Sequence, residues 1–174
     1  MSATSDNTQF SLVPFDKQEW PPLLEPGFYA KTLAQVRVLC VDGFPLSKTR
    51  ADIMLGLENL VAEFVSLSIP ATFWIDGSFL THKVDAHDVD MVIFVAADFY
   101  NSTNPQQKYL LDWINAYQSL EPGPDAVCDA YVAAYWQPGH QYYEIGAENR
   151  RYWINQFGFS RSREIKGMAV VTVP

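Results

Sequence analysis

Apolar and polar positions along the chain repeat with the periods of helices and strands. The longest helical pattern runs over residues 47–67, where apolar side chains recur at steps of three and four. The Ser47 hydroxyl is suited to cap its first turn, and Pro70 enforces a break after it. The residues predicted on the buried face of this helix are Ile53, Met54, Leu57, Leu60, Val61, Phe64 and Val65.

Shorter segments on either side predict three more helices and four strands. The helices are expected at 32–41, 105–120 and 142–157, and the strands at 71–75, 88–96, 126–136 and 167–173. The buried face predicted for the helix at 105–120 consists of Tyr109, Leu110, Trp113, Ile114 and Tyr117. This order of elements predicts an α/β (α+β) fold, with a small mixed β-sheet of about four strands and helices packed against it.

The N-terminal segment has a different character from the rest of the chain. It opens with the small polar run MSATSDNTQ, and the later stretch WPPLLEPG contains three prolines, which favour an extended strap over the surface. A chain of 174 residues fits one domain of ordinary size. The sequence therefore predicts a tail and proline-rich strap at 1–24 and a single domain at 25–174.

The charge of the chain narrows the choice of partners. A formal net charge of −8 argues against a protein that coats duplex nucleic acid, because such proteins neutralise phosphates with Lys and Arg. Basic residues nevertheless gather in the last quarter. They are compatible either with an ordinary solvated surface or with a local basic wall suited to one phosphorylated small molecule. The basic residues of this cluster are Arg150, Arg151, Arg161, Arg163 and Lys166.

The sequence offers no sign of a membrane or secreted protein. No apolar run approaches the roughly 18 residues that a membrane span requires. The start of the chain has neither the basic nor the apolar region of a secretory signal. Cys40 and Cys128 show no paired spacing and are expected to be reduced thiols. We therefore expect a cytoplasmic protein without a membrane partner.

Candidate chemistry begins with two acids at the start of the strand predicted at 88–96. Asp88 and Asp90 are two positions apart, so their carboxylates project to the same face of an extended strand. A divalent cation relieves the repulsion between them, and Mg²⁺ prefers such oxygen ligands. Asp-x-Asp alone is also compatible with a solvated strand edge.

A second feature lies directly after the preceding predicted strand. Gly77 permits a close approach of the backbone to a phosphate, and the Ser78 hydroxyl adds a hydrogen-bonding group. Gly-Ser on its own is a common turn. A strand, Gly-Ser, a short excursion and a strand that opens with Asp-x-Asp form a much rarer combination.

This combination, WIDGSFLTHKVDAHDVDMVIFV at residues 74–95, resembles the polymerase-β-like nucleotidyltransferase superfamily. The flanking segments LLEPGFYAKTLAQVRVLCV and YWINQFGFSRSREIKGMAVVTV resemble a group of small, poorly characterised bacterial and phage-borne proteins that carry the same motif. The resemblance implies a nucleotidyltransferase-like fold in which Asp88 and Asp90 bind metal. It also implies that Gly77 and Ser78 bind phosphate.

The resemblance implies two further groups. A third carboxylate comes from a later strand, for which Asp129 is the candidate and Asp125 the alternative. Asp129 would bind one metal ion and accept the acceptor's proton. Many small relatives follow Gly-Ser with Ala-Arg-Gly, whose arginine helps to hold the triphosphate. Here Gly-Ser is followed by Phe-Leu-Thr-His-Lys, so that Lys83 or a C-terminal arginine would have to substitute.

Together these features predict a nucleotidyltransferase dependent on Mg²⁺ (or Mn²⁺). It would move a nucleoside monophosphate from a nucleoside triphosphate to a protein, RNA or small-molecule acceptor. By analogy it would serve as an antitoxin or phage-defence component, with a cognate toxin as a possible protein partner. The alternative is a catalytically inactive binding module of the same fold that acts through a protein partner or a bound nucleotide. The acidic surface and the missing arginine favour that alternative.

Overall fold

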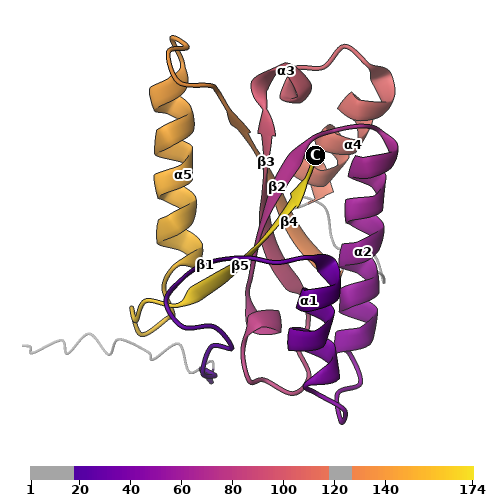
Figure 1. The fold of residues 1–174 in the computed structure, drawn as a ribbon, viewed down its shortest axis with the longest axis vertical. Helices are drawn as coiled ribbons and strands as arrows, with labels where there is room; N and C mark the ends of the chain where they lie inside the picture. The colour runs from indigo at the N-terminus through magenta and orange to yellow at the C-terminus, as the bar shows by residue number, and fades with distance from the viewer. Residues whose placement is uncertain (1–17, 118–126) are drawn as a thin grey trace, which may run out of the picture.

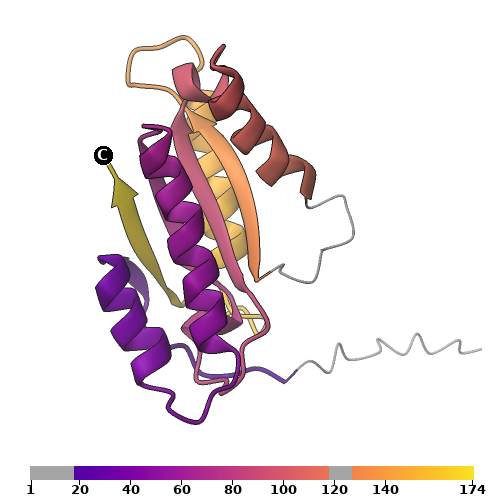
Figure 2. The ribbon, with the colours of Figure 1, turned by 90° about the vertical axis from the view of Figure 1, so that its right-hand side faces the viewer.

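A single β-sheet with helices on both faces organises the chain (Figure 1 and Figure 2). The computed structural model describes residues 18–117 and 127–174. Within them the strands are β1 (Gly27–Ala30), β2 (Ala71–Asp76), β3 (Val89–Ala96), β4 (Cys128–Tyr135) and β5 (Gly167–Val173). The helices are α1 (Leu33–Arg37), α2 (Arg50–Ser66), α3 (Ala97–Tyr100), α4 (Pro105–Tyr117) and α5 (Tyr143–Phe157), with a π-helical turn η1 (Val38–Asp42) and a 3₁₀ turn η2 (Ser78–Leu80).

The sheet is mixed, with the strand order β1-β5-β2-β3-β4. Strand β2 runs antiparallel to both β3 and β5, whereas β3 and β4 are parallel, as are β1 and β5. It follows that the carboxyl end of β2 lies at the same edge of the sheet as the amino ends of β3, β4 and β5. Residues that are far apart in the sequence therefore meet at that edge.

The two faces of the sheet bury separate apolar clusters. Helices α1, α2 and α4 cover one face, and α5 covers the other (Figure 1). Because α5 is alone on its face, its cluster is the smaller one. Its buried members are Trp74, Val92, Phe94, Ala133, Phe157 and Met168.

The mixed sheet with packed helices agrees with the sequence-based prediction, but the number of strands differs. The structure has five strands in its described part, and the additional strand is β1. This strand is only four residues long and follows directly on the proline-rich strap, so it carries no clear alternation of its own. Its pairing with β5 completes that side of the sheet.

The prediction of buried faces was correct for most of α2 and partly wrong for α4. Val65 of α2 is exposed, and on α4 the exposed fractions of Tyr109 and Trp113 are 73% and 47%. Leu111, which was not predicted, is buried beside Leu110 and Ile114. Helix α4 is thus rotated so that leucines, rather than the larger aromatic rings, meet the sheet. The predicted end of this helix and start of the next strand, at 118–126, lie outside the described residues.

The part of the proline-rich strap that the structure describes lies against the loop that follows Gly77-Ser78. Pro22 pairs with Thr81 in an antiparallel bridge, and the Leu23 amide donates to the Leu80 carbonyl at 2.8 Å. The His82 amide donates to the Pro21 carbonyl at 2.9 Å. The strap therefore fixes the backbone that follows Gly77-Ser78. No helix in the described ranges combines the length and the apolarity needed to cross a membrane.

A buried arginine anchors this same loop from the other side. Arg50, the first residue of α2, has an exposed fraction of 0%. Its guanidinium lies 3.7 Å from the ring centroid of Phe44. All hydrogen bonds of the guanidinium in the described chain are to backbone oxygens, at 2.6–3.4 Å: the carbonyls of Cys40, Ser78, Phe79, Thr81, Lys83 and Val84. Since five of these acceptors lie between residues 78 and 84, Arg50 fixes the loop that joins Gly77 to β3.

We predict that Arg50→Met destabilises the fold by about 3 kcal/mol or more, because it leaves several buried carbonyls without a donor. Chemical denaturation measures this loss. Arg37→Met is the matched control, since it removes an arginine whose bidentate contact with Glu58 lies at the surface. Its effect should be clearly smaller. Equal losses for the two variants would contradict the role assigned to Arg50.

Candidate functional site

Three aspartates form a continuous row across β2, β3 and β4, at the edge of the sheet where β2 ends and β3 and β4 begin. Asp76, the last residue of β2, is the register partner of Asp90 in β3, and Asp90 is the register partner of Asp129 in β4. Register partners project to the same face of a sheet. That face is the one covered by α5, because Trp74 and Val92, two positions along β2 and β3, pack in the α5 cluster. We call Asp76, Asp90 and Asp129 the aspartate row.

The carboxylates of the site interact strongly with one another. Burial, together with the neighbouring charges of Asp88, Asp129 and Asp76, raises the pKa of Asp90 to about 7, while Lys166 acts in the opposite direction. Burial also raises the pKa of Asp129, with Asp88 adding to the effect and a hydrogen bond with Tyr131 acting against it. Asp88 lies just before β3 and influences both groups. The structure thus brings together the three carboxylates predicted from the sequence.

The backbone at Gly77 is shaped by this row. Gly77 has φ +79° and ψ −163°, a conformation that favours glycine. A methyl group added at this position would overlap the Asp90 carboxylate. Gly77 is therefore required both for the turn after β2 and for the position of Asp90.

Two buried oxygens beside Gly77 have no hydrogen-bond partner among the described residues: Oδ1 of Asp76 and Oγ of Ser78. Asp76 is 3% exposed, and its Oδ2 pairs with Nζ of Lys166 at 2.7 Å. Burial raises the pKa of Asp76 to about 6, although Lys166 and the Gly77 amide act in the opposite direction. Buried polar atoms are normally paired, so these two oxygens indicate that the site has room for a further polar group.

The positively charged group that lies in the site is Lys166. Lys83, which the sequence proposed for phosphate binding, is held through its backbone carbonyl, which accepts from the Arg50 guanidinium. Other members of the C-terminal basic cluster have different contacts: Arg150 lies over the Phe94 ring, and Arg151 pairs with Glu144 at 3.8 Å. The alternative third carboxylate, at position 125, lies outside the described residues.

The donor chemistry of the site fits a hard divalent cation, although the arrangement is not a closed coordination shell. Asp88, Asp90 and Asp129 offer carboxylate oxygens, and burial together with neighbouring carboxylates raises the pKa of Asp90 and of Asp129. In the part of the chain that the structure describes, no group of three or more His, Cys, Asp or Glu side chains is arranged to hold a metal ion. Mg²⁺ commonly uses one or two carboxylates and takes its remaining ligands from water and substrate phosphates. The residues present match that mode of binding.

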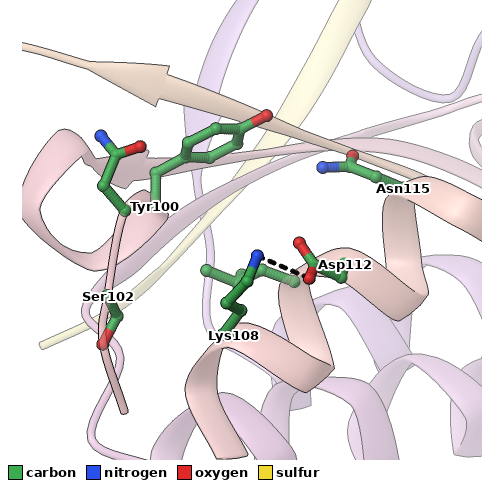
Figure 3. A pocket seen from close by; sticks show the side chains of 7 residues that line it. Tyr100, Ser102, Lys108, Asp112 and Asn115 are labelled. Atoms are coloured by element: carbon green, nitrogen blue, oxygen red, sulfur yellow. Dashed lines mark hydrogen bonds and ion pairs between the residues drawn. The ribbon is translucent and has the colours of Figure 1, made fainter. Parts of the chain in front are cut away.

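A separate pocket of about 280 Å³ lies between α3 and α4 (Figure 3). Several of its polar side chains are engaged with one another or with the backbone. Lys108 pairs with Asp112 at 2.7 Å, and the Asn115 side chain accepts from the Val132 amide of β4 at 3.1 Å. None of the residues predicted for the functional site lines this pocket.

Asp76 and Lys166 were not among the site residues predicted from the sequence. Asp76 directly precedes Gly77-Ser78 and ends an apolar run, which was the available signal for a functional acid. Lys166 was noticed only as part of a basic cluster. Lys166 lies beside Asp76 because β2 and β5 pair in the antiparallel sense, and no local spacing in the sequence reveals this pairing.

These features define a mixed α+β protein with an acidic row beside a glycine turn. The chain belongs to the family described as a family of unknown function (DUF6932), whose model matches residues 14–172. Comparisons with curated proteins and with solved structures found no match.

We predict that Gly77→Ala destabilises the fold by about 1–3 kcal/mol more than Gly139→Ala does, because only the first change adds overpacking to backbone strain. Gly139 is a matched control, since its φ is +90° and an added methyl group would meet no atom within 4 Å. Thermal and denaturant unfolding measure both losses.

The cause of the excess loss is tested by adding Asp90→Ala to each glycine variant. Removing the Asp90 carboxylate should recover much of the excess at Gly77 and leave Gly139→Ala unchanged. An excess that persists without the Asp90 carboxylate would contradict the assigned overlap.

Proposed function

We propose that this protein is a metal-dependent nucleotidyltransferase that transfers a nucleoside monophosphate from a nucleoside triphosphate to an acceptor. The observation that carries the proposal is the aspartate row at the sheet edge where the Gly77-Ser78 turn also lies. Phosphoryl transfer depends mainly on positioning and on neutralising charge, and this edge combines oxygen ligands with a close backbone approach.

The roles follow from position. Asp88 and Asp90 hold a divalent cation, which when bound neutralises the charge of the phosphates and of the departing pyrophosphate. The Gly77 backbone and the Ser78 hydroxyl contact phosphate oxygens. Asp129 completes the acidic set and accepts the proton of the acceptor hydroxyl. That oxygen forms a bond to the α-phosphorus while the bond to the bridging oxygen breaks and pyrophosphate leaves.

The nature of the acceptor rests on the resemblance alone. A protein acceptor, such as a toxin paired with this chain, is the acceptor we propose first, because the small proteins that the flanking segments resemble suggest such a role by analogy. RNA and small molecules are the other acceptor classes.

A second candidate function is a binding module of the same fold that does not turn over. The ion pair between Asp76 and Lys166 favours it, because this pair reduces the negative charge available to a metal. So does the run after Ser78, in which Phe79 and Leu80 are buried and no arginine follows. Release of pyrophosphate from a bound triphosphate separates the two candidates, since the binding module releases none.

We predict that calorimetric titration detects binding of at least one of ATP, GTP, CTP and UTP when Mg²⁺ or Mn²⁺ is present. The double variant Asp88→Asn plus Asp90→Asn should weaken this binding by about tenfold or more, because it removes the charges that hold the cation. The matched control is Asp52→Asn plus Asp98→Asn, which changes the net charge equally at two exposed positions.

Failure of every triphosphate to bind with metal would remove the basis of the proposal. If the double variant Asp88→Asn plus Asp90→Asn binds the triphosphate with the affinity of the wild type, the metal role is assigned to the wrong residues.

A further inference from the structure

The ion pair between Asp76 and Lys166 joins two distant parts of the chain at the glycine turn. Lys166 directly precedes β5, and its amide donates to the Gly158 carbonyl at 3.0 Å. The next amide, of Gly167, donates to the Leu24 carbonyl of the strap at 3.3 Å. The backbone of Lys166 is therefore fixed on both sides, and its side chain is 15% exposed where it reaches Asp76.

This pair leaves hydrogen-bonding capacity unused. An ammonium group has three donors, and among the described residues the Lys166 amine makes one contact, to Oδ2 of Asp76. On the other side of the pair, the buried Oδ1 of Asp76 and the buried Oγ of Ser78 lack partners among the described residues. Leaving buried polar atoms unpaired is costly, and a ligand that brings both donors and acceptors would relieve the cost. A hydrated phosphate chain has this composition.

We propose that Lys166, held in place by Asp76, is the cation that binds the triphosphate oxygens above the Gly77-Ser78 turn. The inference rests on the proposed function and names the residue that replaces the arginine missing after Gly-Ser. Lys166 is the binding residue in this arrangement. Asp76 is a positioning residue, because it acts through the lysine.

The charges around Lys166 set a condition on this binding. Among the described residues, Asp76, Asp88, Asp90 and Asp129 outnumber Lys166, so a polyphosphate alone is repelled from the site. A divalent cation bound to these aspartates offsets their negative charge, so that the site then attracts a polyphosphate. Polyphosphate binding should therefore require the metal as well as Lys166.

The decisive probe is inorganic tripolyphosphate in the presence of Mg²⁺, because it carries the phosphate chain without a base. We expect the wild-type chain to bind it and Lys166→Met to bind it about 10- to 100-fold more weakly, as for loss of a charge-assisted hydrogen bond. Lys166→Arg should keep most of the affinity. Lys83→Met is the matched control and should bind as the wild type does.

Two further variants and one comparison of ligands separate a binding role of Lys166 from a structural one. Lys166→Met plus Asp76→Asn avoids an unpaired buried carboxylate, so that a folded variant without the lysine is obtained, and it should show the same loss. Asp76→Asn alone should weaken binding less than Lys166→Met, since the lysine remains. The two variants that carry Lys166→Met should also lose the preference for tripolyphosphate over monophosphate, while their Mn²⁺ affinity without phosphate is not weakened. A purely structural role would not change that preference.

The outcomes distinguish this inference from the proposed function. Full tripolyphosphate affinity in folded Lys166→Met, or in Lys166→Met plus Asp76→Asn, overturns the inference, and a loss in Lys83→Met instead would assign the phosphate to Lys83, with the transferase proposal intact. Metal-dependent binding of a nucleoside triphosphate without binding of tripolyphosphate also overturns the inference alone. Failure of both ligands to bind with metal overturns the inference and the proposed function together.

Discussion

The arrangement of the site depends on one buried guanidinium. Arg50 donates to carbonyls along residues 78–84 and reaches them from the first turn of α2. Backbone carbonyls, rather than a carboxylate, accept the hydrogen bonds of this buried guanidinium. The burial of its positive charge therefore depends on the loop conformation, and the loop conformation depends on Arg50. Asp85 supports the same junction by accepting from the Ser47 hydroxyl and the Lys48 amide. The helix start and the loop between Gly77 and β3 thus form one unit.

This unit presents polar groups that are unfavourable for stability. The aspartate row gathers negative charge at a partly buried edge, and Gly77 adopts a backbone conformation that only glycine accepts easily. The buried oxygens of Asp76 and Ser78 that find no partner in the described part of the chain add to the cost. Local strain and unsatisfied polar groups of this kind lower the stability of a fold. They concentrate at functional sites, where the surrounding structure holds them in place because function requires them. The concentration of these features at one sheet edge, rather than any single residue, distinguishes the site from the pocket between α3 and α4.

Local patterns predicted much of the fold, whereas contacts between distant segments were less predictable. The apolar period of α2 and the continuous apolar run of β3 follow directly from side-chain order, and both elements appear where the sequence predicts them. The alternation that would reveal β1 is absent, because a four-residue edge strand gains its stability from pairing with β5. Asp88, Asp90 and Gly77 were recognised from spacing. The partnership of Asp76 with Lys166 was not, since it arises from the crossover that brings β5 beside β2.

The central claim is that the acids hold a divalent cation together with a triphosphate. Binding of Mn²⁺ measured by electron paramagnetic resonance, with and without a nucleoside triphosphate, tests it most directly. The account predicts that the triphosphate tightens Mn²⁺ binding, that Mn²⁺ tightens triphosphate binding by the same factor, and that Asp88→Asn plus Asp90→Asn removes both effects. Mn²⁺ binding that is indifferent to every triphosphate, or unchanged in the double variant, would contradict it.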